Sequence, residues 1–123
     1  MNKPEISSDT FSQYIKQAID RLRRHELAEA YKLIIEAIHL DPDAPQPHNL
    51  LGIWFELNNN EDKARKHYRA AYALDPTFKP ACKNLERICT MFQYRPIPYA
   101  YGDELEEENT EGRNRCHAES KSK

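Results

Sequence analysis

Glycine is scarce in this sequence, with 3 residues among 123. Because β-sandwiches and barrels need many tight turns, this scarcity argues against an all-β fold. The 3 cysteines are an odd number without zinc-ligand spacing, and they favour a reducing compartment over a disulfide scaffold. No apolar run approaches the length of a membrane span, and the opening MNKPEISSDT lacks the apolar stretch of a signal peptide. We therefore expect a cytoplasmic protein with no membrane partner.

Neither sign of charge dominates, because 18 Lys and Arg face 20 Asp and Glu, a net charge of −2. A nearly neutral chain has no global field for nucleic acid, so we expect no nucleic-acid partner. The imbalance lies at the C-terminal end, where residues 96–123 hold 7 acidic and 4 basic side chains. This polar composition predicts a disordered acidic tail. Ile97, Tyr99 and Tyr101 are its exceptions, and we consider that they fold back on the preceding helix.

The signatures of catalytic and cofactor sites are also missing. The three glycines are isolated, so the chain has no phosphate-binding glycine loop and no Gly-x-Ser-x-Gly motif. No two histidines stand four apart on one helix with a carboxylate between them, and Cys116-His117 would need ligands from elsewhere to hold a metal. No acidic residue lies within an apolar stretch that would raise its pKa for acid–base work. We expect no enzyme activity, no catalytic residue, no cofactor and no metal.

What the sequence does contain is an internal repeat. Residues 30–42 and 64–76 align at an offset of 34 residues, a period typical of helix–turn–helix units. The matched pairs are Ala30/Ala64, Lys32/Lys66, Ala37/Ala71, Leu40/Leu74, Asp41/Asp75 and Pro42/Pro76.

The repeat shows how two helices pack closely. Ala64, Tyr68 and Ala71 share one helical face, where small residues allow close approach and the ring fills the gap beside them. On the preceding helix, Leu51, Gly52 and Phe55 are grouped together. A glycine within a helix costs about 1 kcal/mol relative to alanine. We therefore predict that Gly52 contacts the helix that carries Tyr68.

On these residues the sequence resembles the tetratricopeptide-repeat family, with about two and a half repeats. The resemblance implies an all-α fold of antiparallel helix–turn–helix repeats, stacked as a short right-handed solenoid with a C-terminal capping helix. It places a flexible N-terminus at 1–8, the domain at 9–95, and helices at about 9–24, 27–40, 45–58, 61–74 and 78–93. The residues that carry it are Ala30, Ala37, Pro42, Leu51, Gly52, Phe55, Ala64, Tyr68, Ala71 and Pro76.

The resemblance also implies a function: a non-catalytic adaptor or complex subunit that binds a segment of another protein in a concave groove. The groove residues that it implies are Asn49, Ile53, Glu56, Leu57, Lys83 and Arg87. Lys79, Lys83 and Arg87 form a basic stripe at helical spacing, which favours an acidic partner segment, although a solvated helix face explains the stripe equally well.

Two alternatives remain open at this stage. A structural protein could self-associate through the uncapped first helix and form a homodimer. Separately, the acidic run that begins at Asp103 and Glu104 could visit the basic stripe and compete with the partner, or remain a solvated tail.

Overall fold

A computed structural model describes residues 6–90 and 98–104 of the chain. These residues form five helices and no strand, so the expected all-α class is confirmed. The helices are α1 (Ile6–Arg23), α2 (Leu27–Leu40), α3 (Gln46–Leu57), α4 (Glu61–Leu74) and α5 (Lys79–Cys89).

The helix bounds agree best with the sequence where start and stop residues are strong. Helices α2 and α4 coincide with the predicted ranges 27–40 and 61–74. Asn60 is the N-cap of α4, and its side chain accepts a hydrogen bond at 3.2 Å from the backbone N–H of Lys63. Helix α1 begins at Ile6, three residues before the expected start at 9, because no helix breaker follows Pro4; residues 1–5 of the expected flexible N-terminus lie outside the described part. Helix α5 ends at Cys89, which is exposed, and the expected residues 91–93 lie outside the described part.

The period of 34 residues recurs in the backbone. Helix α1 turns back on α2 at His25, and α3 turns back on α4 at Asn59; these residues have φ of 62° and 64°. In both turns the next amide, of Glu26 or Asn60, donates a hydrogen bond of 2.8 Å to the carbonyl five residues before it. The same turn geometry is therefore built twice from two different sequences.

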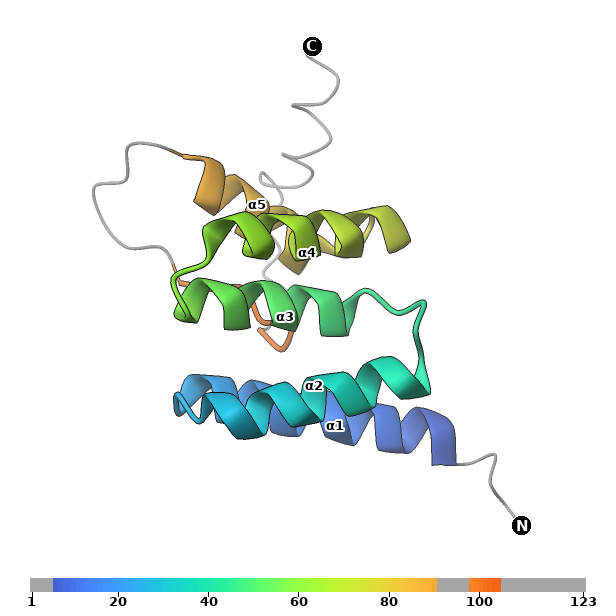
Figure 1. The fold of residues 1–123 in the computed structure, drawn as a ribbon. Helices are drawn as coiled ribbons and strands as arrows, with labels where there is room; N and C mark the ends of the chain where they lie inside the picture. Colours follow the sequence, from blue (N-terminus) through green and yellow to red (C-terminus); the bar gives the residue numbers. More distant parts are fainter. Residues whose placement is uncertain (1–5, 91–97, 105–123) are drawn as a thin grey trace.

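The two helical pairs stack in layers (Figure 1). The α1–α2 pair lies below the α3–α4 pair in this view, and α5 packs on α4 at the far end. Trp54 of α3 joins the pairs, because its indole N–H donates to the carbonyl of Leu27 at 2.8 Å and its ring contacts Tyr31 of α2. The right-handed solenoid stays a prediction.

The repeat positions form the centre of the core, except at the helix ends. Pro42 and Pro76 are exposed and follow the last helical residue by two positions, where they act as stops, while Phe55 is half-buried. A Cβ built on Gly52 would lie 2.2 Å from Cε1 of Tyr68, so the predicted contact is confirmed. The buried repeat residues are Ala30, Ala37, Leu51, Gly52, Ala64, Tyr68 and Ala71.

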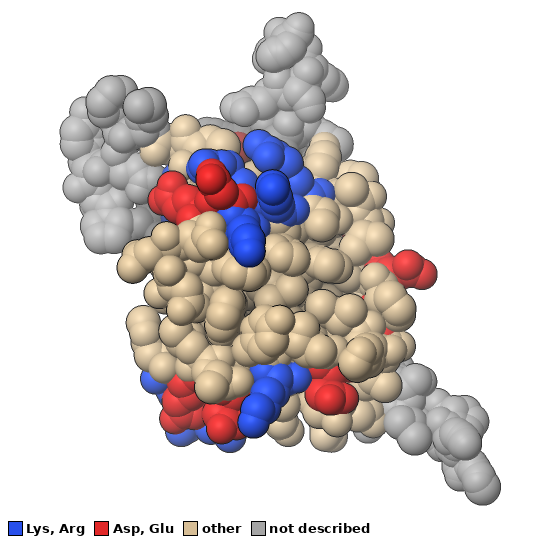
Figure 2. Space-filling model, in the orientation of Figure 1, with Lys and Arg blue, Asp and Glu red and all other residues tan. Residues whose placement is uncertain are grey.

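The face seen in Figure 2 carries its charged side chains mainly at two ends. Basic and acidic residues mix over α4 and again over α1 and α2, with a mostly uncharged band between them. Because both signs mix in each cluster, this face presents no field of a single sign.

A histidine pair joins α3 to α4. The Nδ1 atoms of His48 and His67 lie 3.3 Å apart, and the His67 ring stacks on Phe55 with 5.3 Å between centroids. Burial lowers the pKa of His48. Burial also lowers the pKa of His67, and the neighbouring charges of His48 and Lys63 lower it further.

We expect the protein to lose stability as the pH falls from 7 to 5. Because the folded pKa values lie below the unfolded value of about 6.5, the unfolded chain binds more protons in this window, and stability rises with pH. Thermal melts across this range should show a falling Tm, with a weaker fall in His67→Asn. His39→Asn, which removes an exposed histidine, should keep the wild-type pH dependence. A pH dependence unchanged in His67→Asn would contradict the assignment.

Candidate functional site

The C-terminal residues 98–104, here called the docked segment, lie against α3 and α5 and reach α1. In Figure 1 the segment passes behind α3, between the two helical pairs. It is not helical, and its side chains Tyr99 and Tyr101 are half-buried. This corrects the disordered tail expected from residue 96 onward, for the part that the structure describes; residues 105–123 lie outside it. The docked segment therefore marks a groove formed by three helices.

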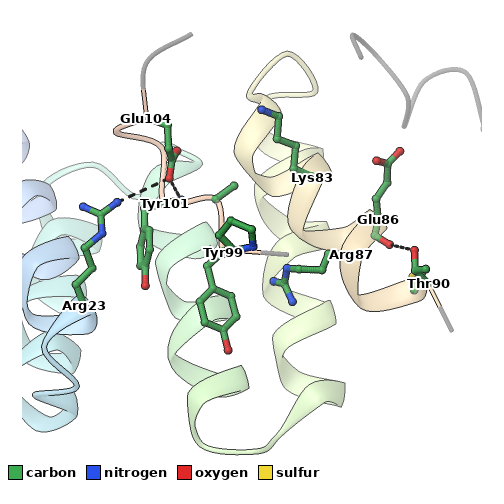
Figure 3. A pocket seen from close by; sticks show the side chains of 11 residues that line it. Arg23, Lys83, Glu86, Arg87, Thr90, Tyr99, Tyr101 and Glu104 are labelled. Carbon is green, nitrogen blue, oxygen red and sulfur yellow. Dashed lines mark hydrogen bonds and ion pairs between the residues drawn. The ribbon is translucent and has the colours of Figure 1, made fainter. Parts of the chain in front are cut away.

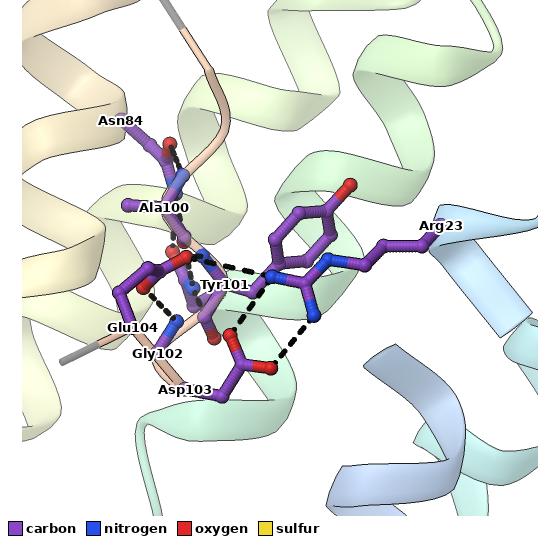
Figure 4. A network of polar contacts seen from close by, with 8 residues as sticks. Arg23, Asn84, Ala100, Tyr101, Gly102, Asp103 and Glu104 are labelled. Carbon is purple, nitrogen blue, oxygen red and sulfur yellow. Dashed lines mark hydrogen bonds and ion pairs between the residues drawn. The ribbon is translucent and has the colours of Figure 1, made fainter. Parts of the chain in front are cut away.

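Two buried asparagines, Asn49 on α3 and Asn84 on α5, bind the backbone of the docked segment. Both are fully buried, and Asn84 Nδ2 donates to Asn49 Oδ1 at 2.8 Å. The carbonyl of Ala100 accepts from Nδ2 of each asparagine at 2.9 Å, and the Ala100 N–H donates to Asn84 Oδ1 at 2.9 Å (Figure 4). Because these bonds involve main-chain atoms, the amide pair can hold a peptide of many sequences.

Leaving such amides unpaired would be costly. A buried polar side chain that loses its partner costs about 1–3 kcal/mol. Asn49 and Asn84 bond to each other, but their remaining donors are satisfied by main-chain carbonyls of Ala100 and Tyr101. The main chain of the docked segment therefore supplies partners that an apolar surface could not supply to these amides.

Beside the amide pair lies a buried ion pair between α3 and α5. Arg87 donates to both carboxylate oxygens of Glu56, with Nη1 at 2.9 Å from Oε1, and the Tyr68 hydroxyl donates to Oε2 at 2.6 Å. The side chains of Arg87 and Glu56 are 10% and 8% exposed. Burial opposes the charge on Arg87, yet hydrogen bonding to Glu56 outweighs it and the pKa of the guanidinium is raised. Burial also raises the pKa of Tyr68 above its usual value.

Two arginines from opposite sides of the groove contact the tyrosine rings of the docked segment. The Arg87 guanidinium lies 4.7 Å from the ring centroid of Tyr99, and that of Arg23 on α1 lies 4.4 Å from the ring centroid of Tyr101. Arg23 also pairs with Asp103 at 2.7 Å and 3.0 Å (Figure 4). The hydrogen bond to Asp103 raises the pKa of Arg23. Each guanidinium thus combines a cation–π contact with a carboxylate pair.

The docked segment closes with a turn at Gly102. Its φ of 105° is a conformation that glycine adopts without strain. The Glu104 carboxylate accepts from the backbone N–H groups of Tyr101 and Gly102 at 2.8 Å and 2.9 Å. This turn aims the adjacent Asp103 carboxylate at Arg23.

A cavity of about 900 Å³ lies between the docked segment and α5. Figure 3 shows Lys83 and Glu86 of α5 along one side of it and the two tyrosines along the other. Thr90 lines its end, where its hydroxyl donates to the carbonyl of Glu86 at 2.8 Å. The docked segment thus leaves part of the groove unfilled.

The structure places the predicted groove residues in different roles. Asn49 is fully buried beneath the docked segment, where it donates to the carbonyl of Ala100, and Lys83 lines the cavity. Ile53 is fully buried in the core, and Leu57 is partly buried against it, so neither presents an apolar surface to a ligand. The reason is that α1 packs against α3 and covers this part of its inner face.

The charged residues for which the sequence predicted a role also have other partners in the structure. Glu56 and Arg87 bind each other rather than facing an empty groove. Asp103 and Glu104 pair with Arg23, at 2.7 Å and 3.9 Å, and not with the basic stripe on α5. The remaining acidic residues of the tail lie outside the described part.

Sequence reasoning missed Asn84. A signal was present, because the dipeptide Asn-Leu occurs at Asn49-Leu50 and again at Asn84-Leu85. These pairs are 35 residues apart, one more than the period of the repeat, so an alignment at 34 places Lys83 opposite Asn49.

Comparisons with known proteins find distant relatives only. E3 SUMO-protein ligase RanBP2 of Homo sapiens is 29% identical over 110 residues, covering 75% of this chain. RANBP2-like and GRIP domain-containing protein 8 of Homo sapiens is 27% identical over 110 residues, again covering 75% of this chain. The chain spans 3% and 6% of the length of these relatives. No family model and no solved structure matches the chain.

These findings correct the assignment to the tetratricopeptide-repeat family. The proteins that match bear the names RanBP2 and RANBP2-like, and no model of the expected family matches. The helical pairs and their period of 34 residues are independent of that family name. The comparisons support a weak similarity to RanBP2 and to a RANBP2-like protein, and the described residues are helical apart from turns and the docked segment.

The described residues offer few other sites. No group of three or more His, Cys, Asp or Glu among residues 6–90 and 98–104 is placed to hold a metal ion. Within the same ranges, no helix is both long and apolar enough to cross a membrane.

Proposed function

We propose that this chain is a non-catalytic protein-interaction module that holds a non-helical segment of a partner protein in the groove between α1, α3 and α5. The observation that carries the proposal is the pair of fully buried asparagines bonded to main-chain atoms of residues 100 and 101. Main-chain binding gives affinity for a peptide as such, while neighbouring side chains select its sequence.

The charged groups of the groove suit binding better than catalysis. Glu56 is bonded to both Arg87 and Tyr68, and Arg23 is bonded to Asp103, so each is held by a partner of opposite charge or a hydroxyl. Acid–base catalysis instead needs a group whose protonation changes near the working pH. The relatives also suit a module, since the match covers only a small part of each. The ligase activity in one relative's name is not carried over to this chain.

The proposal is tested by selecting random peptides on the intact protein and measuring their affinity by calorimetry. We expect peptides with a micromolar Kd, which corresponds to a binding free energy of about −8 kcal/mol. NMR shifts should locate them at the side-chain amides of Asn49 and Asn84. Asn84→Ala should weaken binding by about tenfold or more, because a carbonyl of the peptide loses its buried donor.

Arg69→Ala is the control, because Arg69 is exposed on α4 and outside the groove. Circular dichroism must show equal helix content in both variants. Peptides that bind equally well to Asn84→Ala would contradict the proposal. Self-association, the alternative, predicts a particle size that grows with concentration in light scattering.

A further inference from the structure

The docked segment shows what chemistry the groove accepts. Its two tyrosines are separated by one residue, and their rings meet edge to face at 6.2 Å. Each ring lies against a different arginine, Arg87 for Tyr99 and Arg23 for Tyr101. The carboxylate of Asp103, two residues after Tyr101, accepts hydrogen bonds from both Nη atoms of Arg23. An aromatic–x–aromatic–Gly–acidic pattern therefore fits the groove side chain by side chain.

From this we infer that the partner is an extended protein segment with two aromatic residues separated by one position and an acidic residue within three positions after them, and that it binds by displacing residues 98–104. The inference rests on the proposed function and specifies its ligand. Charge complementarity supports it at Arg23, because the docked segment brings the carboxylates of Asp103 and Glu104 to this guanidinium. Arg87 is already paired with Glu56, and Glu86 lies beside Lys83 along the cavity, so Arg23 is where a basic segment would meet like charge.

The docked segment is held in a way that permits exchange. Asp103 and Arg23 have side chains 39% and 46% exposed, and ion pairs at such exposure contribute about 0–1 kcal/mol. Pro98, Gly102 and Glu104 are exposed as well. The buried amides contact main-chain atoms that any peptide supplies.

The unfilled cavity gives a partner an advantage over the docked segment. A longer side chain, or a residue before the first aromatic, can enter the cavity of about 900 Å³ beside Lys83 and Thr90, which the described residues leave open. A tethered segment competes at an effective concentration in the millimolar range. A partner with additional contacts can therefore displace it, and weakening the tethered segment should reveal the full affinity of the groove.

The test uses the full chain and the synthetic peptide Pro-Tyr-Ala-Tyr-Gly-Asp-Glu, with fluorescence anisotropy as the measurement. The variant Tyr101→Ala with Asp103→Ala weakens the docked segment and should bind the peptide about tenfold or more tightly than the wild type. Leucine in place of both peptide tyrosines should lower the affinity about tenfold, since each guanidinium loses its ring. Replacing the peptide's aspartate and glutamate by asparagine and glutamine should lower the affinity for the wild-type protein a few fold at low salt. The same replacement should lower the affinity for the Arg23→Gln variant by less.

A second measurement on the unaltered protein guards against a variant that simply fails to fold. Hydrogen exchange at the Ala100 amide should be faster than at Ile53 in α3, because residues 98–104 leave the groove without the helices unfolding. Exchange at Ala100 as slow as at Ile53 would overturn the inference, and so would equal affinity for the tyrosine-free peptide. If selected peptides depend on Asn84 but lack aromatic and acidic residues, this inference is wrong and the proposed function stands. If no peptide depends on Asn84, the proposed function itself is wrong.

Discussion

Gly52→Ala is expected to destabilise the protein by about 1–3 kcal/mol, and Gly52→Leu by more than about 3 kcal/mol. A new Cβ would lie 2.2 Å from Cε1 and 2.4 Å from Cδ1 of Tyr68. The ring cannot move aside freely, because its hydroxyl donates to Glu56 at 2.6 Å. Overpacking therefore outweighs the gain of about 1 kcal/mol that alanine brings to a helix. Thermal melts should show Tm lowered by roughly 4–8 °C for each kcal/mol.

Ala64→Leu should have a similar effect, since Ala64 is fully buried on the face of α4 that carries Tyr68. Lys66→Ala is the control, because Lys66 is exposed on α4 and should stay within about 0.5 kcal/mol of the wild type. A Gly52→Leu protein that melts like the wild type would show that α3 and α4 do not pack as closely as the structure places them.

Glu56→Ala should cost about 3–5 kcal/mol, because it leaves the buried guanidinium of Arg87 without its counterion. It also removes the acceptor of the Tyr68 hydroxyl. Urea denaturation with a two-state fit measures the loss. The double variant Glu56→Leu with Arg87→Leu should recover much of it, since apolar residues of similar volume often replace a buried ion pair at little cost.

Glu61→Ala is the matched control. Its carboxylate lies 3.7 Å from Arg65 at the surface, with 64% of its side chain exposed, so its removal should cost less than about 1 kcal/mol. If Glu56→Ala costs no more than Glu61→Ala, the pair with Arg87 does not bridge α3 and α5 in solution. Arg87 also donates to Asn84 Oδ1 at 3.2 Å. Because Glu56→Ala releases Arg87 from its counterion, this variant should also weaken peptide binding in the groove.

The residues that stabilise the packing of α3, α4 and α5 therefore also line or support the groove. Glu56, Arg87 and Asn84 form one connected network from the core residue Tyr68 to the docked segment. Substitutions in this network will change stability and binding together. Arg23 differs, because it is exposed on α1 and contacts the outer end of the docked segment, so its substitution should change binding with little loss of stability.

Local signals in the sequence determined the helices. The bounds of α2 and α4 follow from the recurrent Leu-Asp-Pro stop, and the start of α4 follows from the cap at Asn60. The close contact of Gly52 with Tyr68 was also readable, because a helical glycine needs a packing reason and an alternating small–large face offers one. The helix bounds depend on neighbouring residues, and Gly52 and Tyr68 lie on consecutive helices. Patterns that are local in the sequence are therefore sufficient to predict these features.

The groove was decided by the tertiary structure. Asn49 lies 35 residues from Asn84 and 51 from Ala100, and only the packing of α3, α5 and the docked segment brings their amides together. Tertiary packing also buried Ile53 in a core shared with α1, paired Glu56 with Arg87, and placed Asp103 against Arg23 rather than against the basic stripe. Periodicity assigns a side chain to a helix face, but its partners depend on which distant segment covers that face. For α3 and α5 the covering segment is residues 98–104, where Tyr99 and Tyr101 indicated folding back on the preceding helix but not which side chains they contact.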